Sequence, residues 1–288
     1  MPALQEAVEA ALSADESIAR EFTLPGSRGR SIRASLASIR EGGRQMGAVA
    51  VFHDVTELRR LETVRREFVA NVSHELRTPL TAIRGYAETL KDGGLGDSGQ
   101  AAEFVEVIHR NTLRLQSLIE DLLDLSSIEQ GQARISLGPV SLREVAAQAD
   151  AVIRPAAERK GQSLRFDLPA DVPDPIADRD RLAQVLINLL DNAVKFTPEK
   201  GSITFTARCA DGRVVLAVAD TGAGIPPDEV DRIFERFYRV DRSRDRREGG
   251  TGLGLAIAKH LVQAMGGAIE VKSVPGSGTT FRLTFPAA

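Results

Sequence analysis

Residues 61–90 read "LETVRREFVANVSHELRTPLTAIRGYAETL", and the spacing of their apolar positions decides how this part of the chain folds. The apolar residues recur at alternating intervals of three and four, which is typical of a helix that buries one narrow stripe in a coiled-coil-like seam. We therefore expect a long amphipathic helix from about residue 57 to residue 90. Its seam consists of Val69, Val72, Leu76, Pro79, Ile83, Tyr86 and Leu90, with Leu61, Val64 and Phe68 upstream.

A second helical seam follows the glycine-rich segment "KDGGLGDSG" at residues 91–99. Ile108, Leu115 and Leu122 lie seven apart, and Leu118 and Leu125 repeat the interval beside them. Two amphipathic helices joined by such a turn form an antiparallel hairpin. Because a lone hairpin leaves part of a wide apolar stripe uncovered, we predict a homodimer in which two hairpins form a four-helix bundle.

His74 lies on the face of the first helix that points away from the seam. It precedes Leu76 by two residues, about 200° around the helix, so its side chain should be accessible to solvent. Thr78 is one turn further on the same face, and Glu75 is about 100° away. A neutral imidazole beside a carboxylate is a competent nucleophile. Pro79 removes a helical N–H donor, which predicts a bend just after this pair. An ordinary surface histidine remains the alternative.

The flanking segments have a different character. Residues 1–56 predict a short helix and three strands, "EFTL", "RSIRASLASI" and "QMGAVAVFHDV". Three strands are too few to bury a sheet face, which suggests that they are the C-terminal half of a domain. Residues 135–288 interleave helices and strands, which predicts a helix layer over a mixed sheet. The expected helices are 142–160, 179–196 and 254–265, and the expected strands are 163–168, 202–208, 214–220, 268–273 and 279–285.

Three further stretches point to a nucleotide. "QVLINLLDNAVKFTP" places Asn188, Asn192 and Lys195 on one helical face, where amide oxygens suit a magnesium ion that also holds phosphate oxygens and the lysine neutralises phosphate. An ordinary polar surface is the alternative. In "VADTGAGIP", Asp220 is suited to accept from the amino group of adenine.

The glycines of these stretches suit close approach of a ligand. Gly222 and Gly224 let the backbone come near a base. "GGTGLGL" runs from a glycine-rich loop into a helix, whose free N–H groups form a cradle for phosphate at Gly250, Gly252, Leu253 and Gly254. Each pattern also has a purely structural explanation, as a turn or a helix cap.

The segment between these glycine clusters, "IFERFYRVDRSRDRREGG", is suited to a lid that packs through Phe234 and Phe237 and reaches phosphates with Arg239. The chain contains neither the P-loop pattern nor the dinucleotide-binding fingerprint. Those two nucleotide folds are therefore excluded.

Composition excludes several classes of protein. The 288 residues carry a net charge of −3, which does not suit a protein that covers nucleic acid. Cys209 is the single cysteine, so there is no internal disulfide. The sequence has no apolar run of the length that spans a bilayer and no signal peptide. We expect a cytoplasmic location, with any membrane anchor in segments outside this chain.

Taken in order, these stretches resemble the sensor histidine kinases of bacterial two-component systems. "FVANVSHELRTPLTAIRGY" looks like the H-box of that family, "NLLDNAVKFTP" the N-box, "DTGAGIP" the G1 box, "IFERFYRVD" the F-box and "GGTGLGL" the G2 box. "GAVAVFHDVTELRRLE" similarly resembles the end of a PAS domain. Residues 59–90 look most like phosphate-regulon sensors.

The resemblance implies a fold and a division of the chain. It implies the C-terminal part of a PAS-like domain in residues 1–56, a dimerisation and phosphotransfer hairpin in 57–134, and a Bergerat ATP-binding sandwich with two α/β layers in 135–288. It also implies ATP as substrate, Mg²⁺ as cofactor and a response regulator as partner.

The resemblance further implies a role for each matching residue. His74 would be the phosphoacceptor, Glu75 its base, and Thr78 a residue that positions water when the partner is dephosphorylated. The nucleotide would be held by Asn192 through magnesium, and by Asn188, Lys195, Asp220, Gly222, Gly224, Arg239, Gly250, Gly252, Leu253, Gly254 and Thr279.

Two other classes of function stay open at this level. ATP-hydrolysing relatives of the fold carry a glutamate four residues before the magnesium asparagine, where this chain has Asn188, which cannot accept a proton. Sustained ATP turnover that survives loss of His74 would nevertheless indicate an ATPase, and failure to bind ATP would indicate a non-catalytic scaffold. The sequence also leaves open the stimulus, the balance of kinase and phosphatase activity, and whether a chain phosphorylates itself or its partner in the dimer.

Overall fold

The computed structural model describes residues 6, 8–10, 17–24, 29–42, 44–92, 98–240 and 251–288. The chain forms two compact units, Met1–Ser73 and His74–Ala288, and the long helix α2 (Thr56–Lys91) contributes to both. Among the described helices, none is long and apolar enough to cross a membrane.

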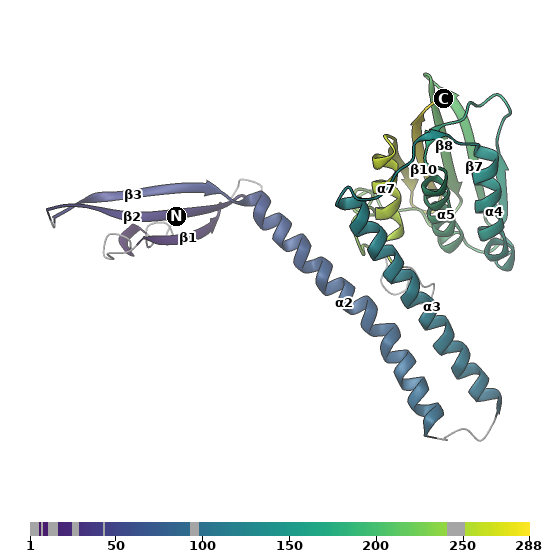
Figure 1. The fold of residues 1–288 in the computed structure, drawn as a ribbon, viewed down its shortest axis with the longest axis horizontal. Helices are drawn as coiled ribbons and strands as arrows, with labels where there is room; N and C mark the ends of the chain where they lie inside the picture. The colour runs from purple at the N-terminus through teal and green to yellow at the C-terminus, as the bar shows by residue number, and fades with distance from the viewer. Residues whose placement is uncertain are drawn as a thin grey trace. The chain divides into compact units, whose positions relative to one another are not determined.

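The first unit contains an antiparallel sheet of strands β1 (Ile18–Thr23), β2 (Ser31–Glu41) and β3 (Arg44–Asp54), in that order (Figure 1). These strands confirm the three that the sequence predicts. Ala34 and Leu36 form the small core of the sheet. Val49, Val51 and Phe52 of β3 are exposed, in agreement with a fragment too small to cover a sheet face.

The start of α2 is held by the residues that leave β3. Asp54 Oδ1 accepts hydrogen bonds from the Thr56 amide, at 2.9 Å, and from the Thr56 hydroxyl, at 2.5 Å. These hydrogen bonds lower the pKa of the Asp54 carboxyl. A carboxylate in this position caps the free N–H groups of a helix start, so strand and helix are joined by a defined turn.

The second unit begins with the helical hairpin that the sequence predicts. α2 continues through Pro79, which is buried, and α3 spans Ser98–Glu129. Within this unit, the Tyr86 and Phe104 rings contact each other with centroids 5.0 Å apart. A second contact joins Glu75 Oε2 to Arg114 Nη2 at 3.3 Å. The predicted bend at Pro79 stays a prediction.

The rest of the second unit is a mixed sheet covered by helices. Strands β5 (Ser163–Asp167), β7 (Ser202–Ala210), β8 (Arg213–Asp220), β10 (Gly278–Pro286) and β9 (Ala268–Val274) lie in that order, with only the β5–β7 pair parallel. Helices α4 (Leu142–Arg159), α5 (Arg179–Phe196) and α7 (Gly254–Ala264) cover one face (Figure 1). A two-stranded ribbon joins β4 (Gly138–Pro139) to β6 (Ile176–Ala177).

Alternation of apolar residues explains the two layers. In β7, Ile203, Phe205 and Ala207 are buried while the residues between them are not, and Phe281, Leu283 and Phe285 repeat the pattern in β10. Strand side chains alternate between the two faces, so these residues point together toward the helices. The predicted helices and strands of this region are confirmed to within two residues at each end.

Helix α5, which carries the predicted nucleotide residues, has a well-defined start. Asp178 Oδ1 accepts from the amides of Asp180 and Arg181, both at 3.1 Å. Such an N-cap stabilises a helix by about 1 kcal/mol. Leu186, Leu189 and Leu190 are fully buried against the sheet and the neighbouring helices, so the orientation of α5 about its own axis is determined by packing.

Candidate nucleotide and phosphoacceptor site

The exposed side of α5 presents the three predicted polar residues. Asn188 and Asn192 are partly buried, and Lys195 is 24% exposed. Lys195 Nζ forms an ion pair with Asp191 Oδ2 at 2.5 Å, one turn earlier on the helix. Phosphate would have to compete with Asp191 for this lysine, which the sequence analysis did not foresee.

The two ends of this α5 face meet the two glycine motifs. The Asn188 Nδ2 amide donates to the Gly254 carbonyl at 3.2 Å, where α7 begins. At the other end, the Ala223 amide donates to the Phe196 carbonyl at 3.3 Å. Eight residues of helix separate Asn188 from Phe196, about 12 Å at 1.5 Å per residue. This span is comparable with the length of a nucleotide from base to phosphates.

Asp220 ends β8 and faces the turn that precedes β10. Its Oδ1 accepts from the Gly222 amide at 2.8 Å and from the Thr279 amide at 3.2 Å. Burial raises the pKa of its carboxyl despite these two hydrogen bonds. A Cβ on Gly222 would approach this carboxylate at 2.7 Å and the Phe196 carbonyl oxygen at 2.6 Å, so only glycine fits beside it. Asp220, Gly222 and Thr279 therefore form one cluster.

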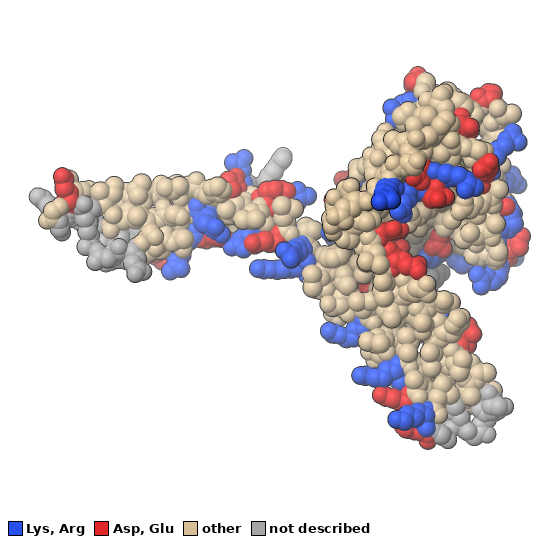
Figure 2. All heavy atoms as spheres, in the orientation of Figure 1, with Lys and Arg blue, Asp and Glu red and all other residues tan. Residues whose placement is uncertain are grey.

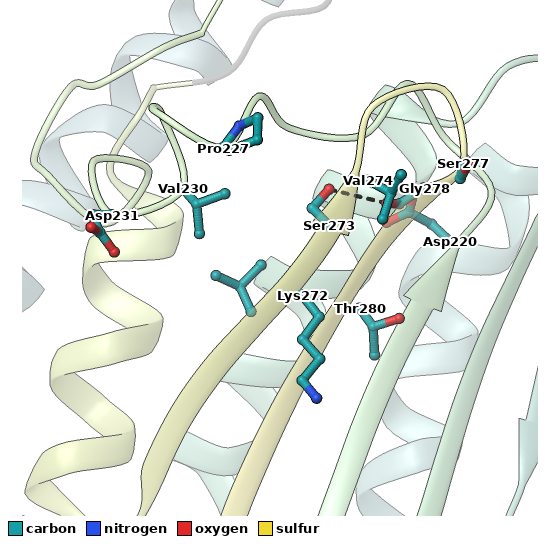
Figure 3. A pocket seen from close by; sticks show the side chains of 11 residues that line it. Asp220, Pro227, Val230, Asp231, Lys272, Ser273, Val274, Ser277, Gly278 and Thr280 are labelled. Atoms are coloured by element: carbon teal, nitrogen blue, oxygen red, sulfur yellow. Dashed lines mark hydrogen bonds between the residues drawn. The ribbon is translucent and has the colours of Figure 1, made fainter.

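Ser273 joins the two loops around Asp220, although the sequence gave no signal for it. Its hydroxyl oxygen accepts from the Ile225 amide at 2.8 Å, contacts the Gly278 carbonyl at 3.0 Å and lies 2.8 Å from the Thr279 hydroxyl. Figure 3 shows Ser273 and Gly278 at the rim of a pocket that Asp220 also lines. Pro227, Val230 and Asp231 of the following loop complete that rim.

This pocket has a volume of about 610 Å³, within the range of small-molecule sites. Asp220, Ser273 and Gly278 line it, but Asn192 and Lys195 do not. In the described residues, it therefore adjoins the base end of the proposed site and does not extend along α5 (Figure 3).

The remaining predicted glycines lie in the loops around these residues. Gly224 has φ +70°, and a Cβ there would meet the Val274 carbonyl oxygen at 2.2 Å. Gly252 lies against the backbone of Phe237, whose amide donates to the Gly252 carbonyl at 2.9 Å. Leu253 is fully buried and precedes α7. Gly250 lies outside the described residues.

His74 and Thr78 are exposed, as the helical phase predicts. The Thr78 hydroxyl donates to the His74 carbonyl at 3.2 Å. Glu75 is partly buried between two guanidinium groups, because its Oε2 lies 3.3 Å from Arg114 Nη2 and 3.5 Å from Arg239 Nη2. Arg239 of the predicted lid is thus next to the phosphoacceptor pair. Arg114 was missed, because the register between α2 and α3 that pairs it with Glu75 is set by the packing of the hairpin.

Helix α3 carries a row of acidic residues that contact α5, α7 and the segment before α7, which together we call the nucleotide-binding layer. Asp121 Oδ2 accepts from the Thr251 hydroxyl at 2.9 Å, and that hydroxyl in turn accepts from the Leu253 amide at 3.2 Å. Burial raises the pKa of the Asp121 carboxyl. Asp124 Oδ2 accepts from Gln184 Nε2 of α5 at 2.7 Å. Thr251 lies inside the predicted "GGTGLGL" motif, whereas Asp121 had no sequence signal.

Helix α3 makes a third contact near its end. Glu129 Oε1 pairs with Arg236 Nη2 and lies 3.6 Å from His260 Nε2 of α7. Burial lowers the pKa of His260. Leu118 and Leu125 are buried on the same helix, so apolar packing accompanies the polar row.

The chemistry of a metal ion at this site is limited by its donors. Among the described residues, no three His, Cys, Asp or Glu side chains lie close enough to hold a metal ion. Magnesium commonly takes one or two protein oxygens together with phosphate oxygens. The amide of Asn192, on the α5 face between the base end and the phosphate end, fits an ion that is bound mainly by the nucleotide.

Two family models match separate parts of the chain. Residues 64–131 match HisKA, the His Kinase A (phospho-acceptor) domain, and residues 177–288 match HATPase_c, described as histidine kinase-, DNA gyrase B-, and HSP90-like ATPase. His74 and most of the hairpin lie within the first region, and α5, α7 and strands β7 to β10 lie within the second. The chain belongs to the two-component sensor histidine kinases.

Particular relatives agree with this class. Sensor histidine kinase WalK of Bacillus subtilis is 41% identical over 86% of this chain, and the match covers 41% of the length of that relative. The solved structure of Acinetobacter baumannii histidine kinase AdeS is similar with a TM-score of 0.62 at 25% identity, over 74% of this chain and 98% of that one. The structure of full-length ShkA in complex with AMPPNP has a TM-score of 0.58 at 38% identity, and the match covers 77% of this chain and 46% of that one.

These comparisons bear differently on the earlier expectations. They confirm the family and the class of fold. The matched family regions do not include residues 1–63, so the PAS resemblance stays a prediction, although a three-stranded sheet is present there. The likeness to phosphate-regulon sensors and the three domain boundaries also stay predictions.

Proposed function

We propose that this chain is a protein-histidine kinase: it transfers the γ-phosphoryl group of ATP to His74 and then to an aspartate of a response regulator. The observation that carries the proposal is the ion pair between Arg239 and Glu75, at 3.5 Å. It joins a residue of the predicted phosphate-binding lid to the neighbour of an exposed histidine. The solved structure of the related protein ShkA is a complex with AMPPNP, which supports nucleotide binding by this chain.

The nucleotide would lie along α5. Asp220, with Thr279 and Gly222 beside it, would accept from the adenine amino group, and Lys195, two turns of α5 away from Asn188, would meet a phosphate oxygen. Asn192 would hold Mg²⁺, which supplies charge neutralisation at the phosphate oxygens. Asn188 already donates to the Gly254 carbonyl, which suits a residue that supports the phosphate loop and does not activate water.

The transfer step exchanges one bond to phosphorus for another. A ring nitrogen of His74 forms a P–N bond with the γ-phosphorus, the bond from that phosphorus to the oxygen of ADP breaks, and the ring gives up its proton to Glu75. Positioning and charge neutralisation account for most of the catalysis in such transfers. Glu75 serves as base once the phosphate has drawn Arg239 away from it.

The partners follow from the exposed site. His74 and Thr78 lie on a solvent-facing side of α2, where a regulator aspartate has access, and Thr78 would position water when the regulator is dephosphorylated. We assign residues 57–134 to dimerisation and phosphotransfer and 135–288 to ATP binding. The chain acts at the cytoplasmic side, as part of a larger sensor, without nucleic acid as partner.

The direct test is labelling by ATP that carries a labelled γ-phosphate. Wild type should gain a label that is stable in alkali and lost in acid, as expected of a phosphohistidine, and His74→Gln should gain none. His109→Gln, which alters another histidine of the hairpin, is the matched control and should label like wild type. Label that persists in His74→Gln would exclude the assignment.

A further inference from the structure

Which histidine each ATP site phosphorylates is a separate question, because a dimer offers two. The described contacts of one chain bear on it directly. Arg239 Nη2 lies 3.5 Å from Glu75 Oε2 of the same chain, and the Arg239 side chain is only 10% exposed. Among the described residues, this Nη2 is buried without a hydrogen-bond partner. The guanidinium is therefore held at its own phosphoacceptor helix with a donor to spare.

The polar row of α3 holds the nucleotide-binding layer against this same hairpin. Asp121 bonds Thr251 in the loop before α7, and Asp124 bonds Gln184 of α5. These two elements are the ones proposed to flank the phosphates. Exposed ion pairs contribute only about 0–1 kcal/mol, so the partly buried Asp121 contact and the packing of Leu118 and Leu125 matter more.

Through Glu75, Arg239 contacts the α2 turn that carries the phosphoacceptor of its own chain. Glu75 and His74 are adjacent, with Cα atoms about 3.8 Å apart. A phosphate bound by the spare donor of Arg239 would therefore lie within reach of His74 of that chain. We infer that autophosphorylation occurs in cis: the ATP site of each chain phosphorylates its own His74. This inference rests on the proposed kinase function.

The step in cis needs no co-reactant besides ATP. The γ-phosphate, which is more highly charged than a carboxylate, competes with Glu75 for Arg239 and releases the carboxylate. Glu75 then takes the ring proton as the P–N bond to His74 forms and ADP leaves with the electron pair of the broken P–O bond. Arg114, on α3, retains its ion pair with Glu75 and keeps it beside His74.

Two mixed dimers of the full chain test the inference with opposite signals. The first pairs His74→Gln with Asn192→Asp, each with a different tag and a different size, purified through both tags in sequence. In cis, neither chain has both an acceptor and an intact ATP site, so no label appears. In trans, the Asn192→Asp chain is labelled by its partner.

The second mixed dimer pairs wild type with the double variant His74→Gln/Asn192→Asp. In cis, the wild-type chain labels itself at the rate per chain of the wild-type dimer. In trans, neither chain is labelled. We expect no label in the first dimer and full label in the second, and the reverse pattern would overturn the inference while leaving the kinase function intact.

Wild-type homodimer is measured in parallel, because its failure to label would refute the kinase function itself and the inference with it. If the two tagged chains do not purify together, the rate per chain is measured over a wide dilution range. A rate per chain that persists at dilutions where light scattering shows only monomers supports transfer in cis, and a rate that is lost together with the dimer overturns it.

Discussion

Asp220 combines a cost in folding with the recognition of adenine that we propose for it. Burial raises the pKa of its carboxyl above the ordinary 3.8, so the ionised form is disfavoured in the folded protein. This cost is absent below the unfolded pKa and is complete once the pH exceeds the raised folded pKa. A buried acceptor that lowers stability at neutral pH and lies beside two glycine-dependent turns is best explained by a ligand that donates to it.

Asp220→Asn should therefore separate folding from binding. The Asn Oδ1 still accepts from the Gly222 and Thr279 amides, so the fold is retained, whereas the new NH₂ faces the adenine amino group. Loss of a charge-assisted hydrogen bond of about 1.5–3 kcal/mol predicts a rise of about 10- to 100-fold in the Kd for ATP. Isothermal titration calorimetry measures it. Asp228→Asn, an exposed control in the next loop, should leave the Kd unchanged.

At the scale of elements, helix α3 has a second role besides forming one arm of the hairpin. It contributes Arg114 to the phosphoacceptor pair and Asp121 to the loop before α7. The Asp121 carboxylate orients the Thr251 hydroxyl so that its oxygen faces the Leu253 amide. The order of the phosphate loop is thus coupled to the hairpin.

Asp121→Ala should loosen that loop. Loss of a hydrogen bond worth about 1 kcal/mol predicts about five-fold faster amide exchange at Leu253, measured by hydrogen–deuterium exchange. Asp121→Asn keeps an acceptor for Thr251 and should keep the protection. Because burial raises the pKa of Asp121, the Asn variant should gain stability over wild type above that pKa and lose the gain as the pH falls toward 3.8.

A matched change next to Asp121 provides the control. Glu120 is exposed, and its Oε1 accepts from Gln116 on α3 itself. Glu120→Ala should therefore leave exchange at Leu253 unchanged. Equal exchange in Asp121→Ala and wild type would show that the loop does not depend on α3.

At the scale of the whole molecule, the hairpin retains an uncovered apolar surface. Val105, Ile119 and Leu123 of α3 are exposed and fall within about 40° of one another around the helix. Figure 2 shows a strip of uncharged residues along the hairpin, whereas charges of both signs are interspersed over the nucleotide-binding layer. Such a strip is typical of a surface that a second copy covers in a four-helix bundle.

Leu123→Lys should weaken the dimer. Leu123 is 66% exposed in one chain, so the substitution costs little in the monomer and places an unpaired charge in the bundle. We expect the molar mass from light scattering after size-exclusion chromatography to fall from that of two chains to that of one. Glu106→Lys, at an exposed polar position of the same helix, should stay dimeric. A monomeric wild type would contradict the bundle.

Local patterns were enough for the elements and for most of the proposed site. The phase of the α2 seam placed His74 outward, and the helical spacing of Asn188, Asn192 and Lys195 placed them on one face. Both results depend only on backbone geometry over a few turns. The competing ion pair of Lys195 with Asp191 was missed because charge pairs one turn apart are common and only the packed structure selects among them.

The sequence by itself determined the family and the main helices and strands, because motif and periodicity are properties of short segments. The residues suited to hold ATP are its prediction. Only the tertiary structure decided what those segments contact. Arg114 meets Glu75 across 39 residues, and Thr251 meets Asp121 across 130. Contacts at such separations depend on how a buried face of one element packs on another. That packing also brings Arg239 to Glu75, the neighbour of His74 in the same chain.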